Sequence, residues 1–250
     1  MTRRTRMQTY LSRFDLPEML RTGREIRSLS NGAATFEEAV QRMCHALYTG
    51  LCDDDGDPAC VLVRCYKTHP FRELPASLQQ FAKASALATG VGPETKCLVL
   101  LGSAGDESEW NSRLSSRHHR AIPLASADVV QQAPMIARLF KDLGVELRHL
   151  LAAQEDSVRQ VRTKTYGVFH IESALGSPAI PAQADFVVRY GVQSVVGCGG
   201  ELPRGEMFAT ILFSRVPVTE SVADRFRALA LDMKASFFRF GPDETFQTTQ

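Results

Sequence analysis

The stretch Gly191-Val-Gln-Ser-Val-Val-Gly197 opens the part of the chain that decides the fold. Its side chains alternate between two faces, and a period of two residues is typical of a β-strand. Glycines and a proline cluster over residues 199–206, which predicts a turn. Residues 207–213 are mostly apolar, β-branched or aromatic and predict the returning strand. The stretch therefore predicts a β-hairpin.

A long helix is predicted after this hairpin. Apolar residues recur every three or four positions from Val222 to Phe237, which is the period of an amphipathic helix. Thr219 is placed to act as the N-cap, and the negative charge of Glu220 is favourable in a first turn. The sequence thus predicts an α+β domain that ends with a hairpin and a helix.

The N-terminal part of the chain predicts two further helices, over residues 16–29 and 36–51. Thr35 and Glu38 have the spacing of a capping box at the start of the second one. Further helical patterns cover residues 75–87 and 126–143 (bent or restarted at Pro134), and residues 146–153 are either a further helix or a linker piece. Strand patterns cover residues 59–66, 96–101 and 165–171.

Length and composition favour one large domain. The chain has 250 residues, 44% of them hydrophobic, which is enough for a substantial core. We expect a flexible arm over residues 1–12, a single domain over 13–240 with insertions at 68–94 and 103–164, and a flexible tail over 241–250. The net charge is only +1, so neither a nucleic acid nor an anionic membrane is expected as the main partner.

Export and disulfide bonding are not expected. No apolar core follows the basic start of the chain, and no run approaches the roughly 20 apolar residues of a membrane-spanning helix. We therefore expect a cytoplasmic protein whose six cysteines are reduced. Cys60 and Cys65 are five residues apart on a predicted strand, which places them on opposite faces and argues against a shared metal.

A polar segment over residues 105–120 is a candidate ligand-binding loop or lid. Trp110 offers a flat apolar wall for a ligand, and Asn111 offers an amide for hydrogen bonds. The alternative for Trp110 is that it anchors its own loop.

The same segment ends in a cluster of cationic residues. Either His118 or His119 could ligate a metal or haem, while Arg120 holds a carboxylate or phosphate. Adjacent residues rarely point the same way on a strand, so only one of the two histidines is expected to face a pocket. The alternative is an exposed basic loop.

Three residues outside the segment are further candidates for holding a cofactor. His170 lies between two apolar residues of a predicted strand and points away from them, toward either a pocket or a structural partner. Cys198, between glycines, is either an accessible thiol or a packed one. The cofactor stays open: haem or a metal is considered through His69, His119, His170 or Cys198. No Gly-x-Ser-x-Gly elbow is present, and no catalytic residue is assigned.

Six short segments carry a resemblance to a known family. They are residues 63–70, 104–111, 119–124, 168–171, 176–183 and 211–217. Taken together, they resemble the GAF-like input region at the N-terminus of bacterial sensor histidine kinases, and the resemblance spans about residues 10–240. A fainter similarity to phytochrome GAF domains involves residues 177–181, but Ala179 stands where their aspartate faces the bilin, so a bilin is not expected.

This resemblance implies a fold, a function and partners. The fold would be a central antiparallel sheet with the N- and C-terminal helices on one face and an inserted layer of loops and helices on the other. The function would be that of a sensory module in a two-component system, not an enzyme, which binds a small molecule and relays its occupancy through the terminal helices. A homodimer and a downstream kinase or PAS domain, in cis or in trans, are the implied partners. Two alternatives remain, an enzyme that uses His119 or His170 and a protein-interaction or dimerisation module without a ligand.

Overall fold

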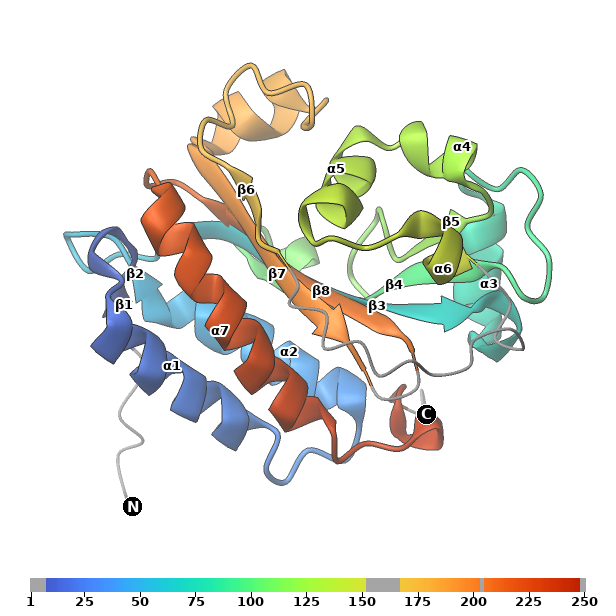
Figure 1. The fold of residues 1–250 in the computed structure, drawn as a ribbon, viewed down its shortest axis with the longest axis horizontal. Coiled ribbons are helices and arrows are strands. Elements are labelled where there is room, and N and C mark those ends of the chain that lie inside the picture. The colour runs from blue at the N-terminus through green and yellow to red at the C-terminus, as the bar shows by residue number, and fades with distance from the viewer. Residues whose placement is uncertain (1–7, 152–166, 203–204, 248–250) are drawn as a thin grey trace.

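The computed structural model describes residues 8–151, 167–202 and 205–247. Its centre is a six-stranded sheet in which every neighbouring pair is antiparallel, with the order β5-β4-β3-β8-β7-β6. Helices cover both faces of this curled sheet (Figure 1). The predicted fold class, a GAF-like α+β arrangement, is confirmed. The strands are β3 (Cys60–Pro70), β4 (Lys96–Gly105), β5 (Ala121–Leu124), β6 (Phe169–Ile171), β7 (Ser194–Glu201) and β8 (Met207–Ser214).

The first and last helices lie together on one face of the sheet, which we call the helix face. They are α1 (Leu16–Leu29), α2 (Phe36–Gly50) and α7 (Glu220–Phe237). Their apolar stripes bury Met43, Phe226 and Met233 against the sheet in one large core. The predicted placement of the terminal helices on one face is therefore confirmed.

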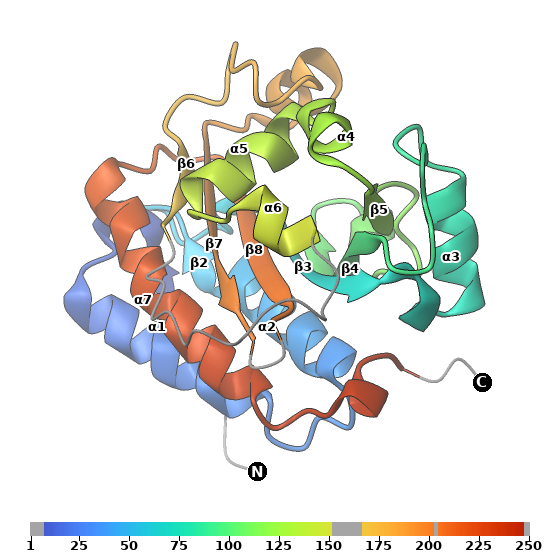
Figure 2. The ribbon, with the colours of Figure 1, turned by 45° about the vertical axis from the view of Figure 1, so that its right-hand side comes forward.

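Short helices cover the opposite face, which we call the loop face (Figure 2). The predicted helix over residues 126–143 is restarted at Pro134, because proline cannot donate a backbone hydrogen bond inside a helix. Phe140 and Phe169 are fully buried in a second core on this side. The elements are α4 (Ala127–Gln131), α5 (Pro134–Asp142), α6 (Leu147–Leu151) and a π-helix (Gln183–Val188), while α3 (Ala76–Lys83) lies beside β5 at the sheet edge.

The predicted capping bond forms at the start of α2 but not at the start of α7. The Thr35 hydroxyl accepts a hydrogen bond from the Glu38 N–H at 3.1 Å, and the Glu38 carboxylate accepts one from the Ala34 N–H at 2.8 Å. These two bonds satisfy N–H groups that a helix start leaves without partners. Thr219 is the residue before α7, but its side chain makes no capping bond there.

The hairpin differs from the prediction in where its turn begins. The expected turn over residues 199–206 is wrong at Gly199, Gly200 and Glu201, which continue strand β7 and pair with β8. A Cβ atom on Gly199 would lie 2.3 Å from the Phe208 carbonyl oxygen. The glycine therefore allows two strands to lie close together. Glycine is frequent both at such positions and in turns, so composition alone does not distinguish the two.

Bulges in β3 and β4 change which side chains share a face. The pairing of β3 with β8 shifts between Cys60 and Leu62, and as a result Cys60 and Cys65 both enter the helix-face core. The prediction that these thiols lie on opposite faces is wrong. In the pairing of β3 with β4, Leu101 is the extra residue, and it lies on the helix face together with Gly102.

The ends of the domain are packed where the structure describes them. Residues 9–10 form β1 (Thr9–Tyr10), which pairs in parallel with β2 (Leu51–Cys52), so the expected arm does not extend that far. Thr245 is buried in the segment for which a flexible tail was expected. Within the described ranges, no helix is both long and apolar enough to cross a bilayer.

Candidate functional site

The predicted binding residues at the start of the polar segment fix their own loop. Trp110 packs against Tyr190 and Phe186, with ring centroids 4.8 and 5.8 Å apart. The Asn111 amide oxygen accepts from the Gly105 N–H at 3.1 Å, and its nitrogen donates to the Gly105 and Glu107 carbonyls. Both side chains therefore hold the loop of residues 106–120, hereafter the cover loop, onto the end of β4.

The cationic residues of the cover loop diverge. His118 and His119 are both exposed, and His119 has a left-handed backbone with φ of 61°. Arg120 folds back onto carbonyl groups of its own loop and lies 5.7 Å from the centre of the Phe81 ring. These contacts leave the Arg120 guanidinium engaged by the loop itself.

The other predicted cofactor ligands lie on the helix face, away from the cover loop. His170 has its ring Nε2 2.8 Å from the Val218 carbonyl oxygen, which fixes β6 to the start of α7. Cys198 is fully buried, with its sulfur 3.9 Å from the Met233 sulfur, and burial raises its pKa strongly. His69 is also buried, beneath the Phe246 ring.

These histidines and the cysteine do not converge on a metal or haem. Among the described residues, no group of three or more His, Cys, Asp or Glu side chains is arranged to hold a metal ion. The Asp-rich turn over residues 53–57 is closed by Asp53, whose carboxylate accepts the N–H groups of Asp55 and Asp57.

A residue that the sequence analysis passed over lies at the centre of the loop face. Arg64 is in the middle of β3 and is only 9% exposed. Its Nη2 donates to the Ser116 hydroxyl at 3.2 Å, and its Nη1 lies 3.5 Å from the Tyr66 hydroxyl. Within the described residues, its Nε has no hydrogen-bond partner and no carboxylate forms an ion pair with it. A buried guanidinium without an anion is unusual, because burying an unpaired charge is costly.

A second polar atom without a partner lies beside Arg64. Ser103 pairs with Arg64 across β3 and β4, which places their Cβ atoms about 4.5–5.5 Å apart on one face. The Ser103 hydroxyl is fully buried and has no hydrogen-bond partner among the described residues. Together these two side chains present an N–H and an O–H donor that the protein leaves unused.

The surroundings of this donor pair are apolar. Arg64 pairs with Ile211 on its other side, and Leu62 and Tyr66 precede and follow it on the same face of β3. Ser116, which touches Arg64 from the cover loop, donates its own proton to the His118 carbonyl at 2.9 Å. The arrangement is a single cation with the hydroxyl groups of Ser103, Ser116 and Tyr66, next to apolar side chains and covered by a loop.

His119 adds no positive charge near neutral pH. Protein atoms that crowd its imidazole, together with the positive charges of Arg64 and His118, lower its pKa to about 4. The ring is therefore neutral above that pH, although the residue remains accessible from solvent. The charge at the candidate site is thus that of Arg64.

A sequence signal for this site existed. Arg64 interrupts an otherwise apolar strand over residues 59–66, and a charged residue inside such a strand is rare unless it has a partner or a function. The partnership with Ser103 could not be found in this way, because it depends on the register of β3 against β4 and on the bulge at Leu101.

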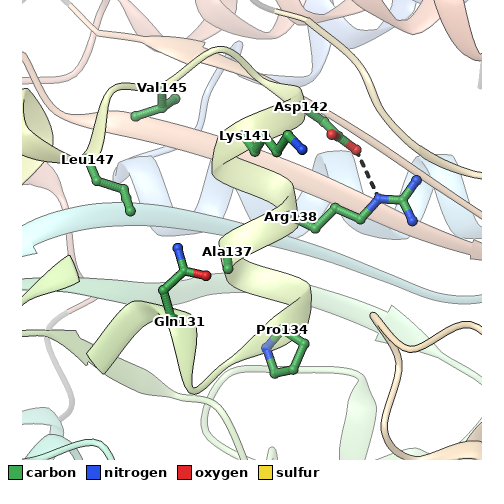
Figure 3. Close-up of a pocket in the computed structure, with 8 residues that line it drawn as sticks. All are labelled: Gln131, Pro134, Ala137, Arg138, Lys141, Asp142, Val145 and Leu147. Carbon is green, nitrogen blue, oxygen red and sulfur yellow. Dashed lines mark hydrogen bonds and ion pairs between the residues drawn. The ribbon is translucent and has the colours of Figure 1, made fainter. Parts of the chain in front are cut away.

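A hollow of about 780 Å³ lies elsewhere on the loop face, around α5 (Figure 3). The Arg138 guanidinium and the Asp142 carboxylate in it already have partners, because Arg138 donates to Asp142 at 3.2 Å and to the His170 carbonyl at 3.0 Å. We therefore assign no ligand to it.

Comparison with known proteins identifies structures but no family. No protein-family model matches the sequence, and no curated protein matches it. A free methionine-R-sulfoxide reductase from Neisseria meningitidis, solved in complex with its substrate, is similar over 88% of this chain and 89% of its own, with 9% identity and a TM-score of 0.48.

Two further similar structures are GAF domains. The GAF domain of the Acinetobacter phosphoenolpyruvate-protein phosphotransferase covers 87% of this chain and 91% of its own, with 12% identity and a TM-score of 0.40. A phycoerythrobilin-bound GAF domain of a cyanobacterial phytochrome covers 87% of this chain and 95% of its own, also with 12% identity and a TM-score of 0.40. At such low identity and TM-score, these likenesses carry no argument about the ligand of this chain.

One expectation from the sequence requires correction. The resemblance implied a sensory domain that is not an enzyme, but a similar structure is that of a reductase, which is an enzyme. The expectation that this chain is not an enzyme is therefore withdrawn.

Proposed function

We propose that this chain binds a small monocarboxylate beneath the cover loop, with Arg64 as the residue that binds the anion. The observation that carries the proposal is the buried guanidinium of Arg64, which has neither a carboxylate partner nor a partner for its Nε among the described residues. The ligand would supply the missing negative charge. Binding of this kind is the first requirement of a ligand-sensing module.

The energetics favour a ligand that brings its own carboxylate. A guanidinium presents parallel N–H groups that match the two oxygens of a carboxylate, and such charge-assisted bonds are stronger than neutral ones. In the proposed complex Arg64 Nε and the Ser103 hydroxyl donate to the ligand. Both atoms gain the hydrogen bonds that they lack in the ligand-free protein.

The charge and the lining of the site define the ligand class. One cation is neutralised by one carboxylate, whereas a phosphate dianion would leave excess negative charge in a buried place. Ile211, Leu62 and Tyr66 flank Arg64 and suit an apolar body next to the carboxylate. Because Arg64 is covered, entry requires the cover loop to move, so ligand binding and loop position are coupled.

A binding assay with matched neutral analogues tests this proposal. We expect acetate, isobutyrate and benzoate to raise the melting temperature and to give binding heats in calorimetry, with the affinity rising with apolar size. Acetamide, isobutyramide and benzamide should not bind, because they carry no charge. Inorganic phosphate should bind more weakly than benzoate.

Two substitutions locate the site. Arg64→Met keeps an apolar stem and should weaken benzoate binding about 30-fold or more, as expected when one partner of a buried charge pair is removed. Arg117→Met is the matched control, because Arg117 belongs to the same loop but is exposed and pairs with Glu109. Equal loss in both variants, binding of the amides, or the absence of any carboxylate binding would refute the proposal.

The partners implied by the resemblance remain predictions. A homodimer and a kinase or PAS partner would follow if occupancy of the site changed the terminal helices. The size of the particle with and without benzoate, measured by light scattering, checks the dimer separately from the binding site.

A further inference from the structure

We propose that residues 245–247, after α7, form a latch that holds the cover loop closed, so that attachment of this segment controls access to Arg64. The proposal rests on the proposed function only for the ligand; the coupling of the segment to the loop stands on contacts within the chain.

The segment is attached to the first turn of α2 at two points. The Glu37 backbone N–H donates to the Thr245 carbonyl at 2.9 Å. The Glu37 carboxylate accepts a hydrogen bond from the Gln247 N–H, also at 2.9 Å. Glu37 thus forms hydrogen bonds with the residues on both sides of Phe246.

The same carboxylate holds the cover loop. Arg113 donates from Nε to Glu37 Oε1 at 2.7 Å and from Nη2 to Glu37 Oε2 at 3.0 Å. The side chains of Arg113 and Glu37 are only 5% and 7% exposed. Ser116, which contacts Arg64, follows Arg113 by three residues. One carboxylate therefore ties together the latch segment and the part of the loop that covers the site.

Phe246 protects this ion pair from water. Its ring lies 5.7 Å from the Arg113 guanidinium carbon and 5.2 Å from the His69 ring. If the segment detached, Glu37 would lose both of its hydrogen bonds to the segment, and the Glu37–Arg113 pair would face solvent, where an ion pair is much weaker. Detachment should therefore loosen Arg113 and, with it, the cover over Arg64.

The coupling is reciprocal. If detachment of the latch opens the loop, a ligand that holds the loop in another position must change the attachment of the latch by the same free energy. The latch segment follows α7 after residues 238–244, which include a short 3₁₀ turn at Pro242–Glu244. This geometry connects the site to the chain beyond α7 without requiring α7 itself to move.

Hydrogen exchange of the ligand-free protein tests the latch directly. Gln247→Pro removes the N–H that Glu37 accepts, and Gln247→Ala keeps it, which makes the two variants a matched pair. Phe246→Ala removes the cover over Arg113. We expect amides over residues 112–120 to exchange about tenfold faster in Gln247→Pro and Phe246→Ala, because a factor of about ten corresponds to the loss of about one hydrogen bond. Their exchange in Gln247→Ala should equal that of the wild type.

The remaining peptides show whether the fold is intact. Amides of α1 and β8 should keep their wild-type exchange rates in all three variants, because none of the contacts of residues 245–247 described above involves these two elements. Faster exchange of residues 245–247 with unchanged exchange of residues 112–120 would overturn the latch. So would an equal effect of Gln247→Ala and Gln247→Pro.

Benzoate binding kinetics separate this inference from the proposed function. With the latch loosened, benzoate should associate about tenfold faster with Gln247→Pro than with Gln247→Ala, the same factor as in the exchange experiment. Equal association rates with clear binding would refute the latch and leave the proposed function intact. If benzoate binds neither variant nor the wild type, the proposed function is refuted. The hydrogen exchange of residues 112–120 then still shows whether the latch holds the cover loop.

Discussion

Arg64 and Arg113 are two buried guanidinium groups with opposite circumstances. Arg113 forms a two-point ion pair with Glu37, and its surroundings contain the negative charge that it needs. Arg64 is similarly buried, yet among the described residues it meets only hydroxyl groups. The difference shows that burial alone does not determine whether a charged side chain is structural or binds a ligand. A paired arginine holds the chain together, whereas an unpaired one is available to a ligand.

The largest expected effect contrasts these two arginines. Arg113→Met should lower the free energy of unfolding by about 3–5 kcal/mol, because it leaves the Glu37 carboxylate buried without its partner. Arg64→Met should change it by less than about 1 kcal/mol, since the variant removes an unpaired charge and keeps the apolar stem. Urea unfolding followed by circular dichroism measures both values.

Adding Glu37→Gln to Arg113→Met sharpens the contrast. The double variant should lose less stability than the sum of the two single variants, because the first substitution already removes the interaction. A cost for Arg64→Met as large as that for Arg113→Met would show that Arg64 is structural. The contrast between a structural and a ligand-binding arginine would then not hold, and the proposed anion site at Arg64 would be refuted.

An intermediate effect concerns His69, which is buried near the latch and close to positive charge. Burial, followed by the charges of Lys67 and Lys96, lowers its pKa well below the usual value of 6.5. Below pH 6.5 the unfolded chain binds a proton there that the folded protein does not bind, so stability falls as the pH falls. The slope for one such group is about 1.4 kcal/mol per pH unit, or about 2 kcal/mol between pH 6.5 and 5.

The variant His69→Gln isolates this contribution. Its stability should fall less steeply over the same interval than that of the wild type, when both are measured by urea unfolding at several pH values. Parallel curves would mean that His69 takes up its proton in the folded state, in which case it does not behave as a buried neutral group.

The smallest expected effect compares two buried serines. Ser194 donates to the Glu172 carbonyl at 2.7 Å and accepts from the Val218 N–H at 3.0 Å. Ser194→Ala should cost about 1–2 kcal/mol, because it leaves the Val218 N–H without a partner. Ser103→Ala should be neutral within about 0.5 kcal/mol in the absence of ligand, because its hydroxyl has no partner to lose among the described residues.

The ligand distinguishes the two serines in the opposite sense. Ser103→Ala should weaken benzoate binding by a factor of about 5–10, the value of one hydrogen bond, and Ser194→Ala should leave it unchanged. Both are measured by calorimetry alongside the unfolding curves. Benzoate affinity that is the same in Ser103→Ala and in the wild type would remove Ser103 from the site.

The sequence predicted the scaffold better than the site. The helices α1, α2 and α7 follow from apolar periodicity and a capping pattern, which are local properties. The sequence left His170 and Cys198 between a ligand-binding role and a packed, structural one, because strand alternation gives two faces but not which one is covered by helices. Both face the helix layer.

The anion site depends on information that is not local. Arg64 is visible in the sequence, but its lack of a carboxylate is a property of everything packed around it. The shared use of Glu37 by Arg113 and Gln247 joins residues more than 200 positions apart and cannot be read from spacing. The cover loop itself was predicted from its polar composition, and anchoring by Trp110 was one of the two interpretations of that residue. The anchoring by Asn111 and Arg113 was found only in the structure.

The extra residue in β4 has a consequence for insertions and deletions. Leu101 and Gly102 both lie on the helix face, so loss of the single codon for Leu101 would restore regular alternation and leave Ser103 beside Arg64. Loss of the codon for Ala104 would instead place Gly102 opposite Arg64 and move Ser103 to the helix face. The first deletion mutant should therefore keep the Ser103 hydroxyl beside Arg64, and the second should lose it. The bulge thus determines where along the strand a residue can be lost without moving Ser103.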